Sequence, residues 1–395
     1  MNDTEKVIQV TPQTRKKGFA QGWLRNSERL PDDARIHARI SAAATDSALA
    51  RLDATGREIV ETVLESYARN ETGKQPEPAD FTLSGHEIVE IDRLPDSATL
   101  RYVVYRYRYN KFPELHRHDA FPPSVQIEPT SICNFRCVMC YQADKSFSRK
   151  SEGFMGHMSL DRFKAAVDEI DGHVEAVTLA SRGEPTLNPA LGDMLRYAEG
   201  RFLGLKLNTN ASMLTERTAH TLLSSDLQTL VFSIDASEPG LYEKIRVNGN
   251  FDAVRRNVET FSELKARKYN DSPMIIRISG VRLNDQQGID DMERFWGGHA
   301  DIVAFTNYNP WQSSYENPEN NITDPCSELW RRMFLWWDGK VNPCDYDYKS
   351  QLSKWAFPER SLSDIWLSDF YEELRANHLA ARRCAHEPCR RCIVT

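Results

Sequence analysis

Short apolar runs alternate with amphipathic helical patterns in the middle of the chain, over residues 121–318. The first run alternates at Val125 and Ile127, which is typical of a strand. Ser159 is a favourable N-cap for a predicted helix over residues 161–170. Further strands are predicted at residues 174–179, 205–210, 230–235, 274–281 and 302–305. Six such units predict an α/β fold with an incomplete, TIM-like (β/α)6 barrel.

The first 120 residues follow a different pattern, and we expect an N-terminal α+β extension over residues 1–120. Residues 46–69 have the apolar spacing of an amphipathic helix. Aromatic and arginine residues alternate within residues 102–109, which predicts a half-buried strand packed on the barrel, with a partner-binding edge as the alternative. Residues 1–45 are polar, with basic residues at 15–17, and are predicted to form a solvated tail or a docking arm. These patterns assign no function to the extension.

The eight cysteines fall in two groups. Cys133, Cys137 and Cys140 have the spacing C-x3-C-x2-C and follow the first predicted barrel strand, at the end of a barrel where active sites collect. Three thiolates suit a cubane iron–sulfur cluster that keeps one iron free of protein ligands. The alternatives are buried thiols or a zinc knuckle, but zinc sites more often combine paired cysteines into four ligands. The other five cysteines lie within the last seventy residues.

With this spacing the chain resembles the radical S-adenosylmethionine (SAM) superfamily, and the resemblance extends over residues 121–395. In that family the free iron binds the amino and carboxylate groups of the methionine part of SAM. One electron from the reduced cluster cleaves the sulfonium, and the resulting 5′-deoxyadenosyl radical removes a hydrogen atom from a substrate. The resemblance implies a 4Fe-4S cluster and SAM as cofactors, and a reductase such as flavodoxin or ferredoxin as the electron donor.

Two strand ends resemble the family's cradle for the methionine part of SAM. Gly183 and Glu184 match the glycine–glutamate element that receives the amino group, although Arg182 stands where the family often has a second glycine. Asn210, at the end of the next strand, matches an asparagine that can form a hydrogen bond near the cofactor. Met139 takes a position where the family often has an aromatic residue, and its sulfur can still pack on a ring.

Later parts of the barrel add two matches and one candidate base. Ser233 takes a position that often contacts the ribose hydroxyls. Arg246 matches an arginine whose guanidinium can pair with the cofactor carboxylate. Asp235 lies at the same strand end as Ser233 and is our candidate for a base that faces the substrate.

Residues 319–395 resemble the SPASM/twitch extension of this superfamily, closer to the form with one auxiliary cluster. Residues 338–339, Asp-Gly between apolar runs, predict a hairpin that brings the cysteines on either side of it together. The resemblance assigns a second, auxiliary 4Fe-4S cluster to four ligands: Cys326, Cys344, Cys389 and Cys392. By spacing alone zinc is the alternative. Cys384 is left over, as a replacement ligand, a hydrogen donor or an inert thiol.

Net charge and the distribution of apolar residues argue against nucleic-acid and membrane partners. The net charge of −7 implies no broad surface for a polyanion, so we expect no nucleic-acid partner. The chain has no apolar run long enough for a bilayer, and its first residues lack the apolar core of a secretion signal, so we expect a cytoplasmic protein that is not bound to membranes.

The resemblance implies the radical but not the substrate. Our first hypothesis is an oxidoreductase that acts on a small hydroxylated molecule, such as a sugar or an aminocyclitol, with the auxiliary cluster as acceptor of the second electron. The alternatives are modification of a peptide or protein, and epimerisation with Cys384 as the hydrogen donor. A cluster-binding scaffold without turnover is the non-enzymatic alternative.

Overall fold

The computed structural model describes residues 19–24, 33–284 and 286–394, and its central feature is a nine-stranded sheet. The strand order is β1-β7-β6-β5-β4-β3-β2-β8-β9. Six parallel strands follow one another in chain order and confirm the predicted incomplete barrel: β2 (Ser124–Ile127), β3 (Ala176–Leu179), β4 (Gly204–Thr209), β5 (Thr229–Ser233), β6 (Ile275–Arg282) and β7 (Ile302–Asn307).

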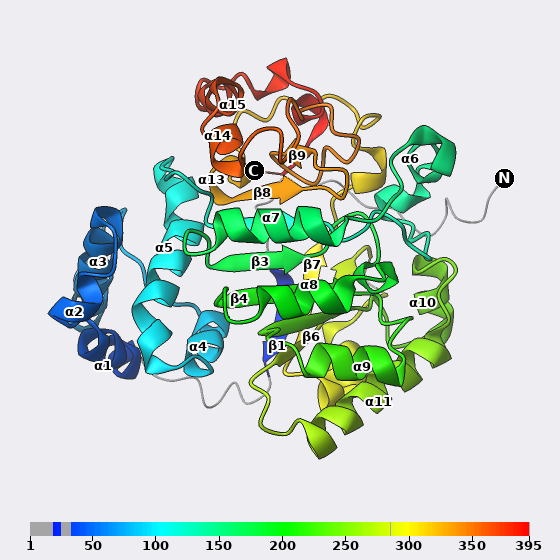
Figure 1. The fold of residues 1–395 in the computed structure, drawn as a ribbon, viewed down its shortest axis with the longest axis horizontal. Coiled ribbons are helices and arrows are strands. Elements are labelled where there is room, and N and C mark those ends of the chain that lie inside the picture. The colour runs from blue at the N-terminus through cyan, green and yellow to red at the C-terminus, as the bar shows by residue number, and fades with distance from the viewer. Residues whose placement is uncertain (1–18, 25–32, 285, 395) are drawn as a thin grey trace.

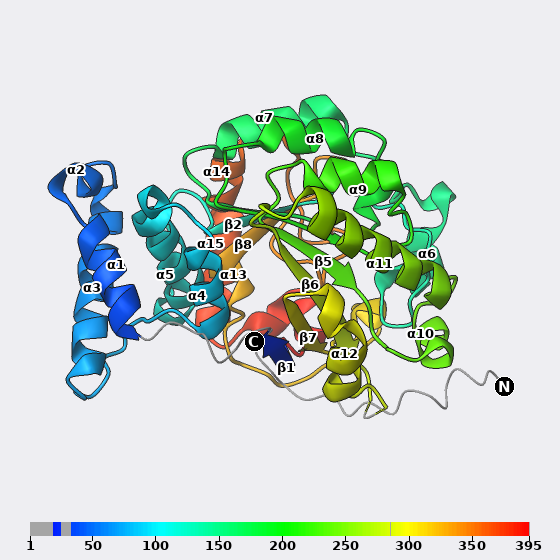
Figure 2. The ribbon, with the colours of Figure 1, turned by 90° about the horizontal axis from the view of Figure 1, so that it is seen from below.

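Helices cover the outer face of this sheet (Figures 1 and 2). They are α7 (Leu160–Ile170), α8 (Leu191–Ala198), α9 (Glu216–Leu223), α11 (Phe251–Lys268) and α12 (Ile289–Trp296). The short helix α10 (Pro239–Ile245) lies beyond the ends of the strands. Ser159 caps α7 as predicted, because its hydroxyl accepts a hydrogen bond from the Arg162 backbone NH. Side chains alternate along each strand, so apolar residues such as Leu205 and Leu207 are buried towards the helices while the residues between them face the inside of the barrel.

Two additions extend the sheet at its edges. At one edge β1 (Phe19–Leu24) pairs antiparallel with β7, so this part of the predicted solvated tail lies in the sheet. The basic residues 15–17 lie outside the described residues. At the other edge β8 (Arg332–Leu335) pairs parallel with β2, and β9 (Val341–Asn342) pairs antiparallel with β8. The Asp338-Gly339 turn between them confirms the predicted hairpin, with the Trp336 NH donating to the Lys340 carbonyl at 2.9 Å.

The predicted strand at residues 102–109 is wrong, because this segment lies in the helix α5 (Thr99–Leu115). Tyr102, Val103, Tyr105, Arg106 and Tyr107 are all buried, so the helix is enclosed around most of its circumference. The alternation of tyrosine and arginine therefore does not separate a buried face from an exposed one, which is what a strand pattern requires.

The remaining helices of the extension are α1 (Asp33–Ala43), α2 (Asp46–Leu49), α3 (Ala54–Glu71) and α4 (Gly85–Asp92). The predicted helix over residues 46–69 is thus divided into α2 and α3. Helices α4 and α5 lie at the starts of the barrel strands, opposite to the arrowhead of β3, and α1 to α3 lie farther out (Figures 1 and 2). None of the described helices is both long and apolar enough to cross a membrane.

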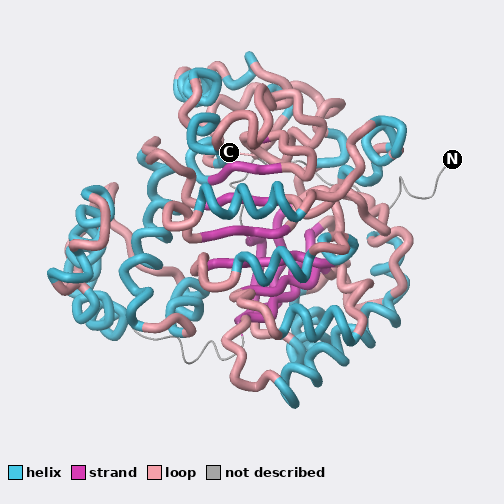
Figure 3. The backbone as a smooth tube through the Cα atoms, viewed as in Figure 1, coloured by secondary structure: helices cyan, strands magenta, loops and turns pink. Residues whose placement is uncertain are grey.

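The C-terminal part is built mainly from loops, as Figure 3 shows above β8. Its helices are short: α13 (Glu328–Arg331), α14 (Leu362–Trp366) and α15 (Asp369–Leu379).

Candidate active site

A cavity of about 910 Å³ occupies the inside of the barrel. It extends from the cysteine loop, where the strands end, to α4 and α5, where the strands begin. All nine residues that were predicted to bind the first cluster or SAM line its wall: Cys133, Cys137, Met139, Cys140, Gly183, Glu184, Asn210, Ser233 and Arg246. At this size a cavity can hold more than one small ligand.

The cysteine loop is fixed by backbone hydrogen bonds to three other segments. Arg136 and Val138 donate to the carbonyls of Val247 and Ile245 at 2.9 and 3.0 Å. The Ser131 NH donates to Gly156, and the Glu184 NH donates to Ile132 at 2.9 Å. Because these segments belong to different β–α units, the loop is held at the centre of the barrel mouth.

The three thiols meet the chemical requirements of a cluster site. All three line the cavity, and burial raises the pKa of each thiol, to about 12 for Cys140. Arg246 opposes this rise at Cys137, because its Nη1 atom lies 3.7 Å from the Cys137 sulfur. Iron would therefore displace protons when it binds these thiols.

Within the described residues, no three His, Cys, Asp or Glu side chains converge as a single metal ion would require. A cubane distributes its cysteines over separate irons, so they need not converge on one point. The assignment of Cys133, Cys137 and Cys140 to a cluster therefore depends on their shared loop and shared cavity.

Gly183 allows the loop after β3 to approach the cysteine loop closely. A Cβ atom at this position would lie 2.2 Å from the Thr130 carbonyl oxygen and 2.7 Å from the Ile132 carbonyl oxygen. Both contacts are with backbone, which cannot rotate away as a side chain can. The sequence match to the glycine–glutamate element therefore has a steric cause in this structure.

We predict that Gly183→Ala moves the cysteine loop and destabilises the protein by about 1–3 kcal/mol, as overpacking usually does. Because the displaced loop carries Cys133, Cys137 and Cys140, the iron content after reconstitution should also fall. The matched control is Gly298→Ala on the exposed turn after α12, where nothing lies within 4 Å of an added Cβ atom. Neither glycine has a left-handed φ, so equal iron loss in both variants would contradict the steric argument.

Glu184 is buried, and both of its oxygens accept hydrogen bonds. Oε1 accepts from the Thr209 hydroxyl at 2.7 Å, and Oε2 accepts from the Asn210 NH at 2.7 Å. Burial raises the pKa of this carboxyl. Asn210 in turn donates from Nδ2 to Asn134 Oδ1 at 3.0 Å, on the cysteine loop. The ends of β3 and β4 and the cysteine loop thus form one connected polar network.

Asp235 and Arg246 form a buried ion pair, and this differs from our prediction of a base that faces the substrate. One Asp235 oxygen bonds to Arg246 Nε, and the other accepts from the Val281 NH at 2.7 Å. Asp235 has no exposed surface and is not among the residues that line the cavity, whereas Arg246 is. In this structure the carboxylate therefore positions the Arg246 guanidinium beside the cysteine loop.

Two further polar residues organise the site and were missed as functional residues by the sequence analysis. Gln142 donates from Nε2 to the carbonyls of Ser131 and Arg182, at 2.7 and 2.6 Å. Arg182 is almost fully buried and donates to both oxygens of Glu128, at the end of β2. The arginine at position 182, where the family often has a glycine, marked this position as unusual. Its partner Glu128 is 54 residues away, so the sequence alone could not identify the pair.

The C-terminal cysteines also gather in one place. Burial raises the pKa of Cys344, and the thiols of Cys389, Cys392 and Cys326 raise it further. Burial and the thiols of Cys392 and Cys326 likewise raise the pKa of Cys389. Cys384 is exposed and lies outside the residues that line the barrel cavity. The predicted set of four is thus brought together without Cys384.

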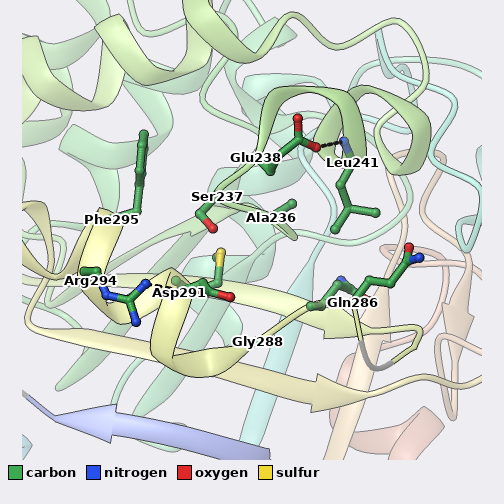
Figure 4. Close-up of a pocket in the computed structure, with 11 residues that line it drawn as sticks. Ala236, Ser237, Glu238, Leu241, Gln286, Gly288, Asp291, Arg294 and Phe295 are labelled. Carbon is green, nitrogen blue, oxygen red and sulfur yellow. Dashed lines mark hydrogen bonds and ion pairs between the residues drawn. The ribbon is translucent and has the colours of Figure 1, made fainter.

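A second, smaller pocket of about 300 Å³ lies between α10 and α12 (Figure 4). Glu238 caps α10 there by accepting a hydrogen bond from the Leu241 NH at 2.6 Å. Phe295 and Arg294 line its other side. No residue that the sequence analysis assigned to chemistry lines this pocket, so the candidate site is the larger cavity.

Comparisons with known proteins agree with this geometry. A family model described as the radical SAM superfamily matches residues 127–294, and one described as an iron–sulfur cluster-binding domain, SPASM, matches residues 326–393. The cofactor-modifying protein for a tungsten-containing aldehyde ferredoxin oxidoreductase of Pyrococcus furiosus is 32% identical over 306 residues, which cover 64% of this chain and 82% of that protein.

Two other similarities are more distant. The mycofactocin maturase MftC of Mycobacterium tuberculosis is 25% identical over 164 residues, so the match covers 42% of this chain and only 40% of the maturase. The crystal structure of Streptococcus suis SuiB bound to precursor peptide SuiA has a TM-score of 0.51, at 17% identity, and covers 82% of this chain and 84% of SuiB. This structural likeness concerns the fold alone.

Proposed function

This chain belongs to the radical SAM superfamily and carries a C-terminal SPASM domain, and from that premise we propose that it oxidises a small hydroxylated molecule, such as a sugar or an aminocyclitol. Membership makes it an enzyme that uses a 4Fe-4S cluster, SAM and auxiliary iron–sulfur chemistry. The substrate class is our proposal.

The chain's own residues have three tasks in this proposal. Cys133, Cys137 and Cys140 hold the first cluster, and Cys326, Cys344, Cys389 and Cys392 hold the auxiliary one. Glu184 and Asn210 present acceptors and donors for the methionine part of SAM, while Asp235 fixes the Arg246 guanidinium for its carboxylate. When bound, these cofactors supply a hydrogen-abstracting radical and an acceptor for the second electron.

The observation that carries the substrate class is the set of polar side chains that face the inside of the barrel. The inward positions of the strands provide hydroxyl and amide groups at Gln126, Thr178, Asn208, Ser233 and Thr306. Helices α4 and α5 close the opposite end of the same cavity. Such a space suits a compact molecule with several hydroxyl groups, because each inward polar group can exchange a water for a substrate hydroxyl. The relative from Pyrococcus furiosus is also named for modifying a cofactor, which is in keeping with a small-molecule substrate.

Peptide modification is the second candidate, and the similarity to a mycofactocin maturase favours it. The N-terminal extension over residues 1–120 would then dock a leader sequence, and its helices lie within residues 33–115. Epimerisation with Cys384 as hydrogen donor receives less support, since that thiol lies outside the cavity wall.

The test is turnover by the reconstituted, reduced protein with SAM and a panel of hydroxylated compounds in deuterated water. We expect 5′-deoxyadenosine to form with a substrate, and the product to be lighter by two hydrogens without deuterium at carbon. Cys344→Ala should retain some SAM cleavage but lose product, because the electron acceptor is lost. A product of unchanged hydrogen count that carries deuterium would establish epimerisation instead, and turnover only with peptides would establish the second candidate.

A further inference from the structure

The end of the cavity farthest from the cysteine loop is closed by the N-terminal helices. Arg101 on α5 forms an ion pair with Glu175, just before β3, at 2.6 Å. Arg93, which follows α4, pairs with Asp301, just before β7, at 3.1 Å and donates to the Pro273 carbonyl at 3.0 Å. The helices are therefore anchored at the starts of three strands, β3, β6 and β7. The residues predicted to bind the cluster and SAM lie towards the other end of the cavity, so this closed end is available for another ligand.

Two cations project into this closed end from the barrel strands. Lys206 lies between Leu205 and Leu207 on β4, and both leucines are buried on the outer face. Arg277 lies in the same way between buried Ile276 and Ile278 on β6. Strand alternation therefore directs Lys206 and Arg277 inward, and both line the cavity. Only β5 separates their strands.

The nearby carboxylates are committed to other partners. Glu87 accepts hydrogen bonds from Arg106 and from Asn110, the latter at 2.8 Å. Glu90 accepts from the Tyr102 hydroxyl at 2.6 Å. Glu328 pairs with Arg332 at 2.9 Å and with Arg331 at 3.8 Å. In the described part of the chain, no carboxylate lies within ion-pairing distance of the Lys206 ammonium.

The charges around Lys206 are mostly positive. Burial lowers the pKa of Lys206 to about 7, and the lowering is reinforced by Arg277 on β6, Arg332 on β8 and Arg106 on α5, while Glu90 on α4 opposes it. Burial also lowers the pKa of Arg277, to about 10. A buried lysine beside several arginines is costly to protonate unless an anion compensates it, so an anion bound at this end of the cavity would favour the charged form of Lys206.

We propose that Lys206 and Arg277 bind a carboxylate or phosphate group of a small substrate at the closed end of the cavity. Thr178 and Gln126 line the same wall beside Lys206, in register across β3 and β2, and can add hydrogen bonds. Lys206 precedes Asn210 by four residues, which is roughly 13 Å along a strand. The anionic end is thus held well away from the cysteine loop, while the rest of the molecule extends towards it. The substrate part of this inference rests on the proposed function, whereas the anion site does not.

The probe is sulfate, because it does not titrate near neutral pH. We expect calorimetric titration of the full-length, reconstituted protein at pH 7.5, in buffers of different ionisation enthalpy, to show sulfate binding with uptake of about 0.5–0.8 proton, since binding would recharge Lys206. Lys206→Met should weaken binding about 10- to 100-fold and abolish the proton uptake. Arg277→Gln should weaken binding similarly, and it provides the test if the first variant does not fold.

The matched control is Lys268→Met, which removes an exposed lysine at the end of α11 and should leave sulfate binding unchanged. Without sulfate and at about pH 6, where Lys206 with a pKa of about 7 is mostly charged, Lys206→Met should also raise the thermal midpoint, because it removes a buried charge. Sulfate binding that is absent in the wild type, or unchanged in both cavity variants, would overturn the anion site.

Turnover separates this inference from the proposed function. Equal turnover of neutral compounds and their phosphorylated or carboxylated forms, unaffected by Lys206→Met, would overturn the substrate part of the inference and leave the proposed function standing. A protein that turns over no small molecule but binds sulfate through Lys206 would retain the anion site and lose the proposed function.

Discussion

Replacing Cys133, Cys137 or Cys140 by alanine is expected to abolish reductive cleavage of SAM. Each thiol lines the central cavity, and the cluster that they are predicted to hold is the source of the electron. Loss of a residue that only supports a metal ligand typically costs 10- to 100-fold in affinity or activity. Loss of a direct ligand should therefore exceed about 100-fold. The measurement is 5′-deoxyadenosine formed under anaerobic reduction, together with the spin-resonance signal of the reduced cluster.

Cys326→Ala is the matched control, because it removes a thiol of the same kind from the C-terminal group. It should reduce the iron content while the first cluster keeps its signal and some cleavage remains. Full cleavage in any of the three loop variants would refute the assignment of the cysteine loop, and so would a protein that takes up only zinc.

The barrel could be predicted because its strands are separated by helices with clear apolar faces. For β3 to β7, predicted and observed limits differ by a few residues, and Ser159 was correct as a helix cap. The N-terminal helix α5 could not be predicted in the same way. Its Arg106 is buried against Glu87 of α4, a partner that the local pattern does not show, so the alternation gave a false strand. The pairing of β1 with β7 depends likewise on a contact between distant segments.

In the site, too, residues that share a short motif could be predicted, whereas contacts between segments distant in the sequence could not. Spacing identified the three loop cysteines, and the structure brings them into one cavity with Glu184 and Arg246. The chemistry of Asp235 was misjudged, because a carboxylate at a strand end has no visible partner in the sequence until the fold places Arg246 beside it. Lys206 looks like an ordinary surface lysine until strand alternation turns it inward.

Arg182 joins the barrel to the C-terminal part, which explains why a glycine would be a poor substitute here. Its guanidinium donates to the two oxygens of Glu128 at 2.7 and 2.6 Å, and to the Tyr348 carbonyl at 2.8 Å. The same group stacks 4.4 Å from the ring centre of Trp336, which directly follows β8. Arg182 is 2% exposed and Glu128 is 0% exposed, so water cannot replace either partner.

Arg182→Met is therefore expected to destabilise the protein by about 3–5 kcal/mol, because it leaves the Glu128 carboxylate buried without its cation. Adding Glu128→Gln removes that charge, and the double variant should recover more than half of the loss. Arg196→Met breaks an exposed ion pair with Asp193 and is the control, with a loss below about 0.5 kcal/mol. Anaerobic urea unfolding of the reconstituted proteins measures all three. If the double variant were no more stable than Arg182→Met, the uncompensated carboxylate would not be the cause, and lost packing on Trp336 would have to replace it.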